Sequence, residues 1–286
     1  MMAYHEQRRY ADSYHLTISR VHEMDFLAHY HGEIELFFVE SGQQKLGINN
    51  RALTLSAGQI GLVAPWHIHY YEAAGPVSGY MLIFDPGIMD RYHPNRSGLW
   101  TLDPDSATFA DLSVLLRQLH DEMGAKPDWY ELAASSLLHR FFVRLFRSGQ
   151  SNQLQELHAD GQKQHAIMQD ILTHLADHYQ NPLSRGELAR HFGISPSHFS
   201  RIFKAATGLS LTDYLARLRV EQARACIVAG RESITEIALS SGFESIRTFN
   251  RCFHRIHGCT PSSLRRQSTT GSASGGVLAD ERFQLG

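Results

Sequence analysis

The sequence contains few cysteines and no long apolar run, and both absences narrow the class of protein. Only three of its 286 residues are cysteines, Cys226, Cys252 and Cys259, and their spacing matches no zinc-ligand pattern. No run approaches the roughly 18 apolar residues of a membrane span. The first residues, MMAYHEQRRYADSYH, include no apolar stretch of signal-peptide length. We therefore expect free thiols, no membrane partner and a cytoplasmic location.

The charge is low overall but unevenly distributed along the chain. The formal net charge is -2. Residues 1–165 hold 13 Lys and Arg against 19 Asp and Glu, whereas residues 166–266 hold 13 against 8. An acidic first part and a basic second part indicate two domains with different partners. A basic domain is typical of polyanion binding, although a solvated surface has the same composition.

The first hundred residues have the pattern of short strands. Apolar or alternating runs are separated by Gly, Asn, Ser and Pro; they are IELFFVESG, QKLGIN, RALTLSAG, QIGLVAPW and GYMLIFDP. Many short strands with closely spaced turn signals predict a small β-barrel or sandwich. We assign this domain to residues 1–105.

A helical period then replaces the strand pattern. FADLSVLLRQLHDEM and ELAASSLLHRFFVRLF repeat apolar residues at three- and four-residue intervals, which predicts amphipathic helices over 108–123 and 129–147. We assign 106–147 to a helical packing or dimerisation segment. The polar stretch 148–165 is predicted to be a linker, and the tail 267–286, rich in Ser, Gly and Thr, is predicted to be flexible.

Residues 166–266 have a helical pattern throughout and contain an internal repeat. LSRGELARHFGISPSHFSRIFKAATGLSLTDYL aligns with SITEIALSSGFESIRTFNRCFHRIHGCTPSSL. Each copy consists of a short helix, a glycine turn and a second helix, which predicts helix-turn-helix units at about 185–206 and 233–256. The connecting helix, roughly 211–229, would be about 28 Å long at 1.5 Å per residue. Successive major-groove faces of DNA lie about 34 Å apart.

Capping residues support these helices at both ends. Ser195, which precedes a proline, Thr212 and Ser233 stand at predicted N-caps. Glycines stand at the predicted helix exits, namely Gly208, Gly230 and Gly258.

The second helix of each copy separates apolar anchors from polar side chains. Phe199 and Phe203 in the first copy, and Phe249 and Phe253 in the second, recur at helical spacing and should be buried. Arginine can pair with guanine and asparagine with adenine, whereas Lys and Ser more often contact phosphate. Any amphipathic helix separates such residues, but two tandem copies in the basic half favour DNA binding. The predicted DNA-binding residues are Ser195, Ser197, His198, Ser200, Arg201, Lys204, Glu244, Ser245, Arg247, Thr248, Asn250, Arg251 and His254.

This repeat closely resembles the AraC/XylS family of bacterial transcription regulators over roughly residues 168–266. The resemblance follows the pattern GF-x5-FNR-x-F-x4-G-x-TP, carried by Gly242, Phe243, Phe249, Asn250, Arg251, Phe253, Gly258, Thr260 and Pro261. SPSHFSRIFKAATG matches the first unit, and YLARLRVEQARACI matches the connecting helix. The resemblance implies a seven-helix domain that binds promoter DNA and activates transcription by contacting RNA polymerase. Cys252 departs from the family pattern without affecting this interpretation.

The strand-rich part carries a histidine motif. In HYHGEIELFFVESG, His29, His31, Glu35 and Gly42 fit HxH-x3-E-x6-G, which resembles the first motif of the cupin barrels. Two histidines at alternate strand positions point to the same side, and Glu35 can reach back to them. The later stretch LSAGQIGLVAPWHIHYYE is a weaker match to the second cupin motif.

Three interpretations of the histidines stay open. The family resemblance implies a sensor without a cofactor, in which polar groups bind a small effector, such as a sugar, and aromatic rings stack on it. Alternatively, His29, His31, Glu35 and His69 hold Fe, Mn or Zn, in a sensor or in a cupin-type metal-dependent enzyme with a helical appendage. In the third interpretation the histidines are structural. The effector-binding candidates are His29, His31, Glu35, Trp66, His67, His69 and Tyr70.

Taken together, the sequence predicts an α+β protein of two domains. The first is a cupin-like β-barrel with amphipathic helices, and the second is an all-α domain with two helix-turn-helix units. Leucine stripes in the amphipathic helices are typical of a core, but family members often dimerise through helices in this place, so we predict a homodimer. We expect a transcription activator without enzymatic activity that responds to a small effector.

Overall fold

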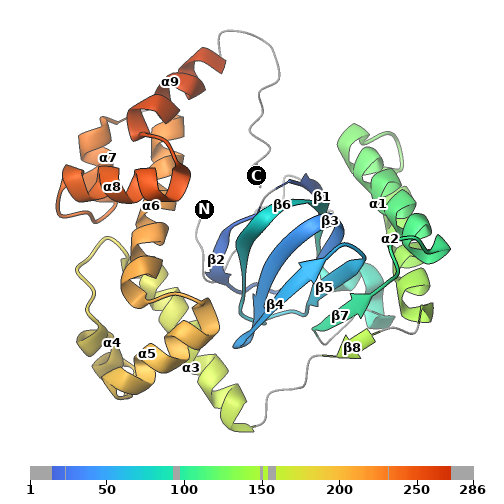
Figure 1. Cartoon of the computed structure of the whole chain (residues 1–286), viewed down its shortest axis with the longest axis horizontal. Helices are drawn as coiled ribbons and strands as arrows, with labels where there is room; N and C mark the ends of the chain where they lie inside the picture. Colours follow the sequence, from blue (N-terminus) through green and yellow to red (C-terminus); the bar gives the residue numbers. More distant parts are fainter. Residues whose placement is uncertain are drawn as a thin grey trace. The chain divides into compact units, whose positions relative to one another are not determined.

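The computed structural model divides the chain into two compact units, formed chiefly by Tyr30–Gly161 and by Gln162–Glu281. The first unit is a sheet with helices, and the second is helical (Figure 1). No helix among the described residues is long and apolar enough to cross a membrane. The structure describes residues 15–22, 24–92, 97–148, 151–153, 159–230 and 232–271.

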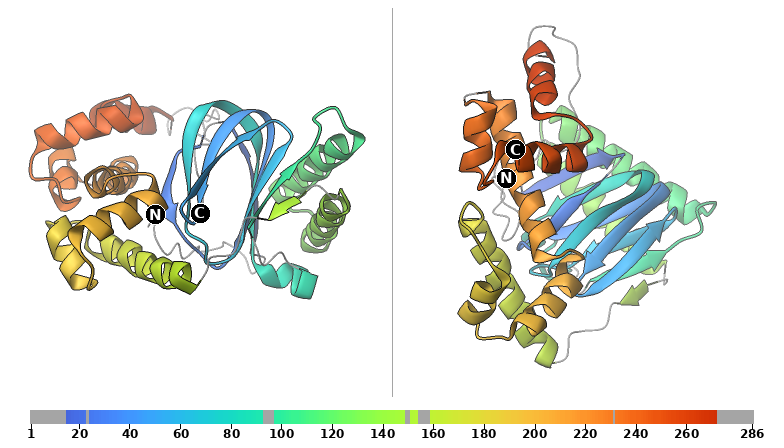
Figure 2. Two further views of the ribbon diagram at one scale, coloured as in Figure 1. Left: turned by 60° about the horizontal axis from the view of Figure 1, so that its bottom comes forward. Right: turned by 60° about the vertical axis from the view of Figure 1, so that its left-hand side comes forward.

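Eight strands form one sheet in the first unit. They follow the order β1-β6-β3-β5-β7-β8, with β2 paired to β6 and β4 paired to β3. The predicted mainly-sheet fold is confirmed, but this path is open at both ends, so the described strands form a curled sheet and not a closed barrel (Figure 2). The strands are β1 (Leu16–Val21), β2 (Phe26–His29), β3 (Ile34–Ile48), β4 (Arg51–Ser56), β5 (Gln59–Val63), β6 (His69–Phe84), β7 (Gly98–Thr101) and β8 (Ser151–Gln153).

Two of these strands are longer than the sequence pattern indicated. IELFFVESG and QKLGIN, expected as separate strands, are joined in β3, which pairs with β6 along its length. Irregularities in the register of this pair mark β-bulges at the bend. Gly42 lies at the bend with a φ of +78°, and a Cβ atom added there would lie 2.0 Å from the carbonyl oxygen of Pro76. This glycine lets the strand bend without ending it.

Both faces of β3 are buried, each against a different core. Leu36 and Phe38 pack with the helices that cover one face of the sheet. Phe37 and Val39, which alternate with them, belong to a second core that includes Tyr71. Burial on both sides explains why the sequence shows a continuous apolar run here, where a half-exposed strand would alternate.

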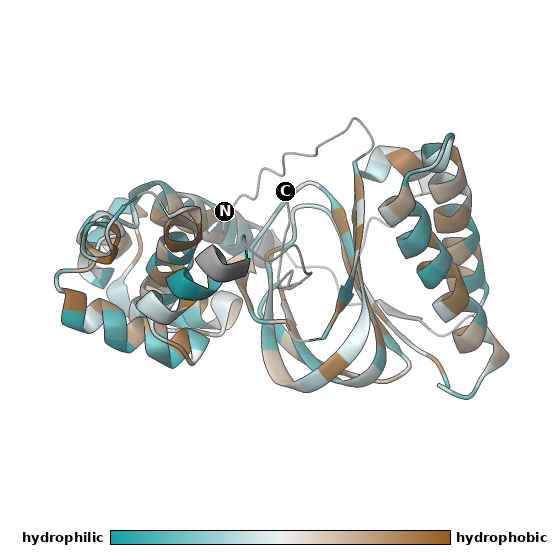
Figure 3. Cartoon of the chain, turned by 90° about the horizontal axis from the view of Figure 1, so that it is seen from above, coloured by the Kyte–Doolittle hydropathy of each residue, from teal (hydrophilic) through white to brown (hydrophobic). Residues whose placement is uncertain are grey.

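The two predicted amphipathic helices are present as α1 (Ala107–Ala125) and α2 (Tyr130–Arg147). Both carry apolar and polar residues on different sides (Figure 3). A short helical segment, η1 (Pro86–Tyr92), precedes β7. The predicted leucine stripe belongs to the sheet core, where the buried residues are Leu112, Leu115, Leu116, Leu119, Leu138 and Phe141.

The second unit contains seven helices among its described residues. The pair α4 and α5 and the pair α7 and α8 lie where the sequence predicted the helix-turn-helix units, near opposite ends of α6 (Figure 1). The helices are α3 (Ala159–His178), α4 (Arg185–His191), α5 (Pro196–Thr207), α6 (Leu211–Ala229), α7 (Ile234–Ser240), α8 (Ile246–His257) and α9 (Pro261–Gly271).

Two predicted boundary segments fall partly outside the described residues. The stretch 148–165, predicted to be a linker, includes β8 and the first residues of α3. The predicted tail begins within α9, and its residues after 271 lie outside the described part of the chain. The proposed domain limits therefore stay predictions.

Serine N-caps and glycine C-caps delimit the helices of this unit. The N-cap predicted at Ser233 is confirmed, but the one predicted at Thr212 is wrong. Ser210 caps α6 instead, because its hydroxyl accepts a hydrogen bond from the backbone N–H of Asp213. The predicted glycine exits are confirmed, with left-handed backbone at Gly208, Gly230 and Gly258.

Candidate nucleic-acid interface and buried histidine cluster

The two helix-turn-helix units start with the same capping arrangement. The Ser184 hydroxyl accepts a hydrogen bond from the backbone N–H of Glu187, whose carboxylate accepts one from the backbone N–H of Ser184. Ser233 and Glu236 form the equivalent capping box in the second unit. The hydrogen bonds with serine lower the pKa of both glutamates.

The turns of the two units also match. Gly193 and Gly242 have φ values of 66° and 87°. The residue after each glycine donates its backbone N–H back to the first helix, over 2.9 Å from Ile194 to the Ala189 carbonyl and over 3.1 Å from Phe243 to the Ala238 carbonyl. The internal repeat in the sequence is therefore also a repeat in three dimensions.

Helix α5 presents cations on the side opposite its anchors. Phe199 and Phe203 are fully buried, whereas Arg201 and Lys204 are exposed. An Arg201 Nη2 atom lies 3.0 Å from His198 Nδ1. Three of the predicted residues have local roles. The Ser195 hydroxyl caps the helix by accepting a hydrogen bond from the His198 N–H, and it also lies 3.2 Å from the Ser197 hydroxyl. The Ser200 hydroxyl donates to the Pro196 carbonyl.

Helix α8 has the same division of faces. Phe249 and Phe253 are fully buried, and Cys252 is buried beside them. The helix begins at Ile246, slightly later than the sequence suggested, because the Ser245 hydroxyl caps it by accepting from the Thr248 N–H. Its exposed polar residues are Arg247, Asn250, Arg251 and His254, and Glu244 is exposed just before the helix.

The cations of α8 fall into two groups. Arg255 faces α6, with Nη2 3.7 Å from an Asp213 carboxylate oxygen. By contrast, within the described residues Arg247 and Arg251 on α8, and Lys204 on α5, form no ion pair with a carboxylate. These three side chains can therefore bind an external anion without breaking an internal contact.

Arg219 on α6 holds the segment after α3, against which the second turn packs, and sequence reasoning did not identify it. Its Nε donates to the Tyr179 carbonyl over 2.7 Å, and Nη2 donates to the Asn181 carbonyl over 2.9 Å. A Cβ atom at Gly242 would lie 2.7 Å from the Gln180 carbonyl oxygen, so this glycine allows close packing on the same segment. The burial of Arg219 lowers its pKa, and nearby Glu244 opposes that shift. An arginine within an amphipathic helix gives no sequence signal for such a role.

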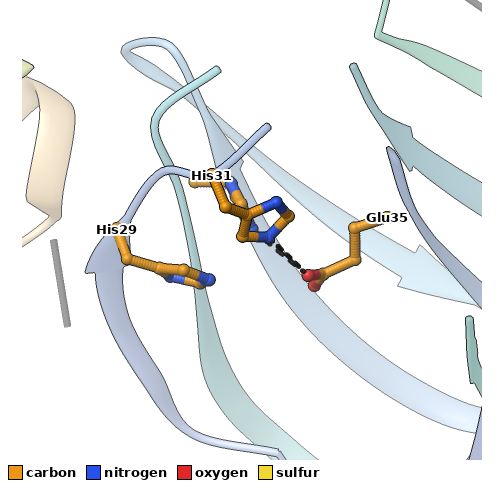
Figure 4. Close-up of side chains that lie close together, drawn as sticks. His29, His31 and Glu35 are labelled. Carbon is orange, nitrogen blue, oxygen red and sulfur yellow. Dashed lines mark hydrogen bonds and ion pairs between the residues drawn. The ribbon is translucent and has the colours of Figure 1, made fainter. Parts of the chain in front are cut away.

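A second candidate site is formed by residues on and next to three strands of the sheet. His29 is at the end of β2, His31 follows it and Glu35 is on β3 (Figure 4). His69 is the first residue of β6. Each of the four is at most 2% exposed. One potential ligand atom from each residue can be chosen so that all four atoms lie within 4.8 Å of one another. We call these four residues the histidine cluster.

Glu35 is at the centre of the histidine cluster. One of its carboxylate oxygens lies 3.1 Å from His31 Nε2 and 3.5 Å from His69 Nε2. The rings of these two histidines meet edge to face, with centroids 4.9 Å apart. Burial raises the pKa of Glu35, but the charge of His69 and the hydrogen bonds from His31 and His69 outweigh burial and hold that pKa well below its usual value.

The outer ring nitrogens of the cluster are bound to neighbouring groups. His29 Nδ1 donates to the Leu27 carbonyl over 2.8 Å, and His69 Nδ1 donates to the His67 carbonyl over 2.9 Å. Because a carbonyl can only accept, each of these Nδ1 atoms carries the proton, and in the neutral ring Nε2 then carries a lone pair. His31 Nδ1 lies 3.3 Å from a Glu33 carboxylate oxygen.

Two of the other predicted effector-binding residues lie outside the histidine cluster. Trp66 is 52% exposed and packs against Gly32, where an added Cβ would lie 3.1 Å from its ring. His67 Nδ1 lies 2.6 Å from the Ser97 hydroxyl.

Tyr70 is also separate from the cluster, because neighbouring strand residues point to opposite faces. Its ring covers Gly47, where an added Cβ would lie 1.9 Å from it. Tyr71 instead shares the face of His69, with ring centroids 6.2 Å apart. Strand alternation could have selected Tyr71 over Tyr70 if the bounds of β6 had been known.

Comparisons with known proteins agree with this division of the chain. A family described as "Helix-turn-helix domain" matches residues 188–267, and one described as "AraC-like ligand binding domain" matches residues 15–142. The "HTH-type transcriptional regulator GlxA" of Rhizobium meliloti (strain 1021) is 35% identical over 104 residues, which are 36% of this chain and 32% of that protein. The "HTH-type transcriptional activator RhaS" of Escherichia fergusonii is 26% identical over 254 residues, which are 84% of this chain and 88% of that protein.

Among solved structures, an apo form of a ToxT variant from Vibrio cholerae has a TM-score of 0.48 and 13% identity, covering 91% of this chain and 99% of that chain.

Proposed function

Because the chain belongs to the AraC/XylS family of transcription regulators, we propose that it binds specific promoter DNA and activates transcription in response to a small effector. The observation that carries this proposal is the duplicated helix-turn-helix unit, whose second helices expose Lys204, Arg247 and Arg251, which form no ion pair with a carboxylate of the described residues. Exposed cations on both second helices are suited to binding the phosphate backbone of DNA.

In this proposal α5 and α8 each enter a major groove. Buried phenylalanines on the opposite side hold each helix against its own unit, which leaves the polar side for DNA. Helix α6 has 19 residues and is therefore about 28 Å long, close to the roughly 34 Å between successive major-groove faces. One duplex could then accept both helices on one side.

The exposed residues suit different roles on DNA. Arg247 and Asn250 are the side chains best suited to base edges, and Arg201 has the same role on α5. Lys204 and Arg251 would neutralise phosphates. Ser195 and Ser245 cap their helices and so fix where each helix begins. The backbone N–H groups at a helix N-terminus favour the binding of phosphate.

The remaining parts of the proposal concern the sheet unit. We propose that it binds the effector, for which the family resemblance implies a sugar or related metabolite, and that α1 and α2 form a homodimer contact. Exposed apolar side chains on these helices support the dimer, including Val114, Val143 and Phe146. RNA polymerase is the proposed protein partner, and the cytoplasm the proposed location.

An enzymatic role is the alternative that the histidine cluster itself favours, because such donors can hold a catalytic metal. A catalytic site also needs room for substrate. The residues of the histidine cluster are each at most 2% exposed, which leaves a substrate little access to a metal held there. We therefore propose a regulator without enzymatic activity.

A binding assay on the full chain tests the proposed function. Labelled DNA from upstream of the protein's own gene should shift in a gel at protein concentrations that leave a scrambled duplex of equal length free. The affinity should fall linearly with salt on logarithmic axes, because phosphate contacts release counterions. Equal affinity for both duplexes would contradict sequence-specific regulation.

A further inference from the structure

We infer that the histidine cluster, made of His29, His31, His69 and Glu35, binds one divalent first-row transition-metal ion. This inference goes beyond the proposed function. It takes from that proposal only the role of the sheet unit as a sensor. It names the chemical class that this part of the protein would bind: a metal ion.

The donor set is that of a transition-metal site. Three imidazole nitrogens and one carboxylate oxygen suit Zn²⁺, Fe²⁺, Mn²⁺ or Ni²⁺, which accept mixed nitrogen and oxygen ligands. The four donor atoms already lie within 4.8 Å of one another. Metal–ligand bonds of about 2.0–2.2 Å would draw them together by small side-chain movements. The residues come from three strands and the β2–β3 turn, so the sheet itself sets their positions.

The outer contacts of the rings are those expected of metal ligands. A ligating histidine usually donates its second ring N–H to a carbonyl or carboxylate, which fixes the tautomer and aims the other nitrogen at the metal. His29 and His69 donate Nδ1–H to backbone carbonyls, and His31 Nδ1 faces the Glu33 carboxylate. In His29 and His69 this places the ring lone pair on Nε2, whereas His31 Nε2 lies 3.1 Å from the Glu35 carboxylate inside the cluster.

Electrostatics also favour a cation at this point. The carboxylate of Glu35 and the inward Nε2 atoms converge at a place that is almost completely buried. Partial negative charges brought together away from water repel one another unless a positive charge lies between them. A metal ion supplies that charge. The competing source is a proton on His31 or His69, which would make a purely structural ion pair with Glu35.

The space around the histidine cluster fits an ion better than a sugar. Phe37 and Tyr71 fill the same core, and each cluster residue is at most 2% exposed. A ligand the size of a sugar would have to displace packed side chains, whereas an ion would not.

Direct metal titration of the full-length protein tests the inference. The protein is stripped with EDTA, dialysed, and titrated with Zn²⁺, Mn²⁺ or Ni²⁺ in a calorimeter, and metal content is then measured by mass spectrometry after desalting. We expect one ion per chain for at least one metal, with a rise in melting temperature as the metal concentration exceeds Kd. His69→Gln and Glu35→Gln should weaken binding at least about 10–100-fold, the loss seen even for outer contacts of metal ligands.

His120→Gln is the matched control, because it removes a partly exposed histidine on α1, and its metal binding should equal that of the wild type. The wild-type titration decides the question even if a cluster variant does not fold. Less than about one-tenth of an ion per chain for every metal, or equal binding by His69→Gln and wild type, would overturn the site in favour of the proton-bridged ion pair. Gel shifts run in parallel separate the two proposals. A protein that binds the specific DNA but fails the metal titration contradicts only the metal site. A protein that binds metal but not the specific DNA contradicts only the proposed regulator.

Discussion

Arginines on the same helix differ in their surroundings, and this difference allows a controlled test of DNA reading. Arg247 is exposed on α8, whereas Arg255, two turns later, faces Asp213 on α6. If Arg247 contacts a base, Arg247→Ala should weaken binding to the specific site by about 1–3 kcal/mol while non-specific binding changes little.

Arg255→Ala is the control for that variant, because it removes an arginine of the same helix that is instead paired with Asp213. Fluorescence anisotropy with specific and scrambled duplexes provides the measurement. A uniform loss on both duplexes would reassign Arg247 to phosphate contact, and equal losses in both variants would mean that α8 is not the reading helix.

At the scale of elements, the second helix-turn-helix unit depends on its capping box. Ser233→Ala removes the cap of α7 and should lower the free energy of unfolding by about 0.5–2 kcal/mol, measured by urea denaturation. Ser136→Ala, on α2, serves as a comparison, because it removes an exposed serine hydroxyl that donates to the Leu132 carbonyl within its own helix and caps nothing. An unchanged midpoint for Ser233→Ala would show that the cap contributes nothing to stability.

The same box makes a pH-dependent contribution whose sign follows from Glu236. The backbone and side-chain hydrogen bonds of Ser233 lower the pKa of Glu236 below its usual value in the folded state. The stabilisation is therefore present above the unfolded pKa, about 4.3, and is lost as pH falls through the lower folded pKa. An NMR titration of the Glu236 side chain should show this depressed pKa in the wild type and a higher one in Ser233→Ala. A titration identical in the two proteins would disprove the assignment.

Two glycines with similar backbone angles should respond differently to alanine. Gly42 has a φ of +78° and lies against Pro76, whereas Gly258 has a φ of +68° with no atom within 4 Å of an added Cβ. Gly258→Ala should cost about 1–2 kcal/mol for the left-handed backbone alone. Gly42→Ala should cost clearly more, because the bulge in β3 must also move. Equal losses in thermal denaturation would mean that the bulge has no steric constraint.

At the scale of the whole molecule, the predicted homodimer is testable through α2. Val143 is 46% exposed, unlike the buried stripe of the same helix. Val143→Asp should shift the protein from dimer to monomer in sedimentation velocity, since a buried carboxylate at an interface is costly. Leu239→Asp places the same charge at an exposed apolar residue of the helical unit and should leave the dimer intact. A monomeric wild type, or no effect of Val143→Asp, would rule out this contact.

Helices were easier to predict than strands because their signals are local. Periodicity, serine caps and exit glycines placed α1, α2 and α4 to α8 within a few residues. The one wrong cap, Thr212, competed with Ser210 two residues away, and only the hydrogen bond to Asp213 distinguishes them. The strands were harder to predict, because a glycine such as Gly42 can either end a strand or form a bulge within one, and the local sequence does not distinguish the two.

The candidate sites show the same division. The sequence named the members of the histidine cluster from a spacing pattern, and the structure brings those four together. The side chains of Trp66, His67 and Tyr70 are not among the four converging donors, although Trp66 donates its backbone N–H to the His31 carbonyl and the His67 carbonyl accepts from His69. Arg219 had no sequence signal, since its partners are backbone carbonyls that any residue could supply.

The sequence by itself determined the two-part organisation, the amphipathic helices and the repeated helix-turn-helix unit, because composition, periodicity and capping act over a few neighbouring residues. Only the tertiary structure decided that the sheet is open, that β3 is buried on both faces, and that Arg255 faces α6 while Arg247 faces outward. Those outcomes depend on contacts between residues far apart in the chain, whose partners no local pattern specifies.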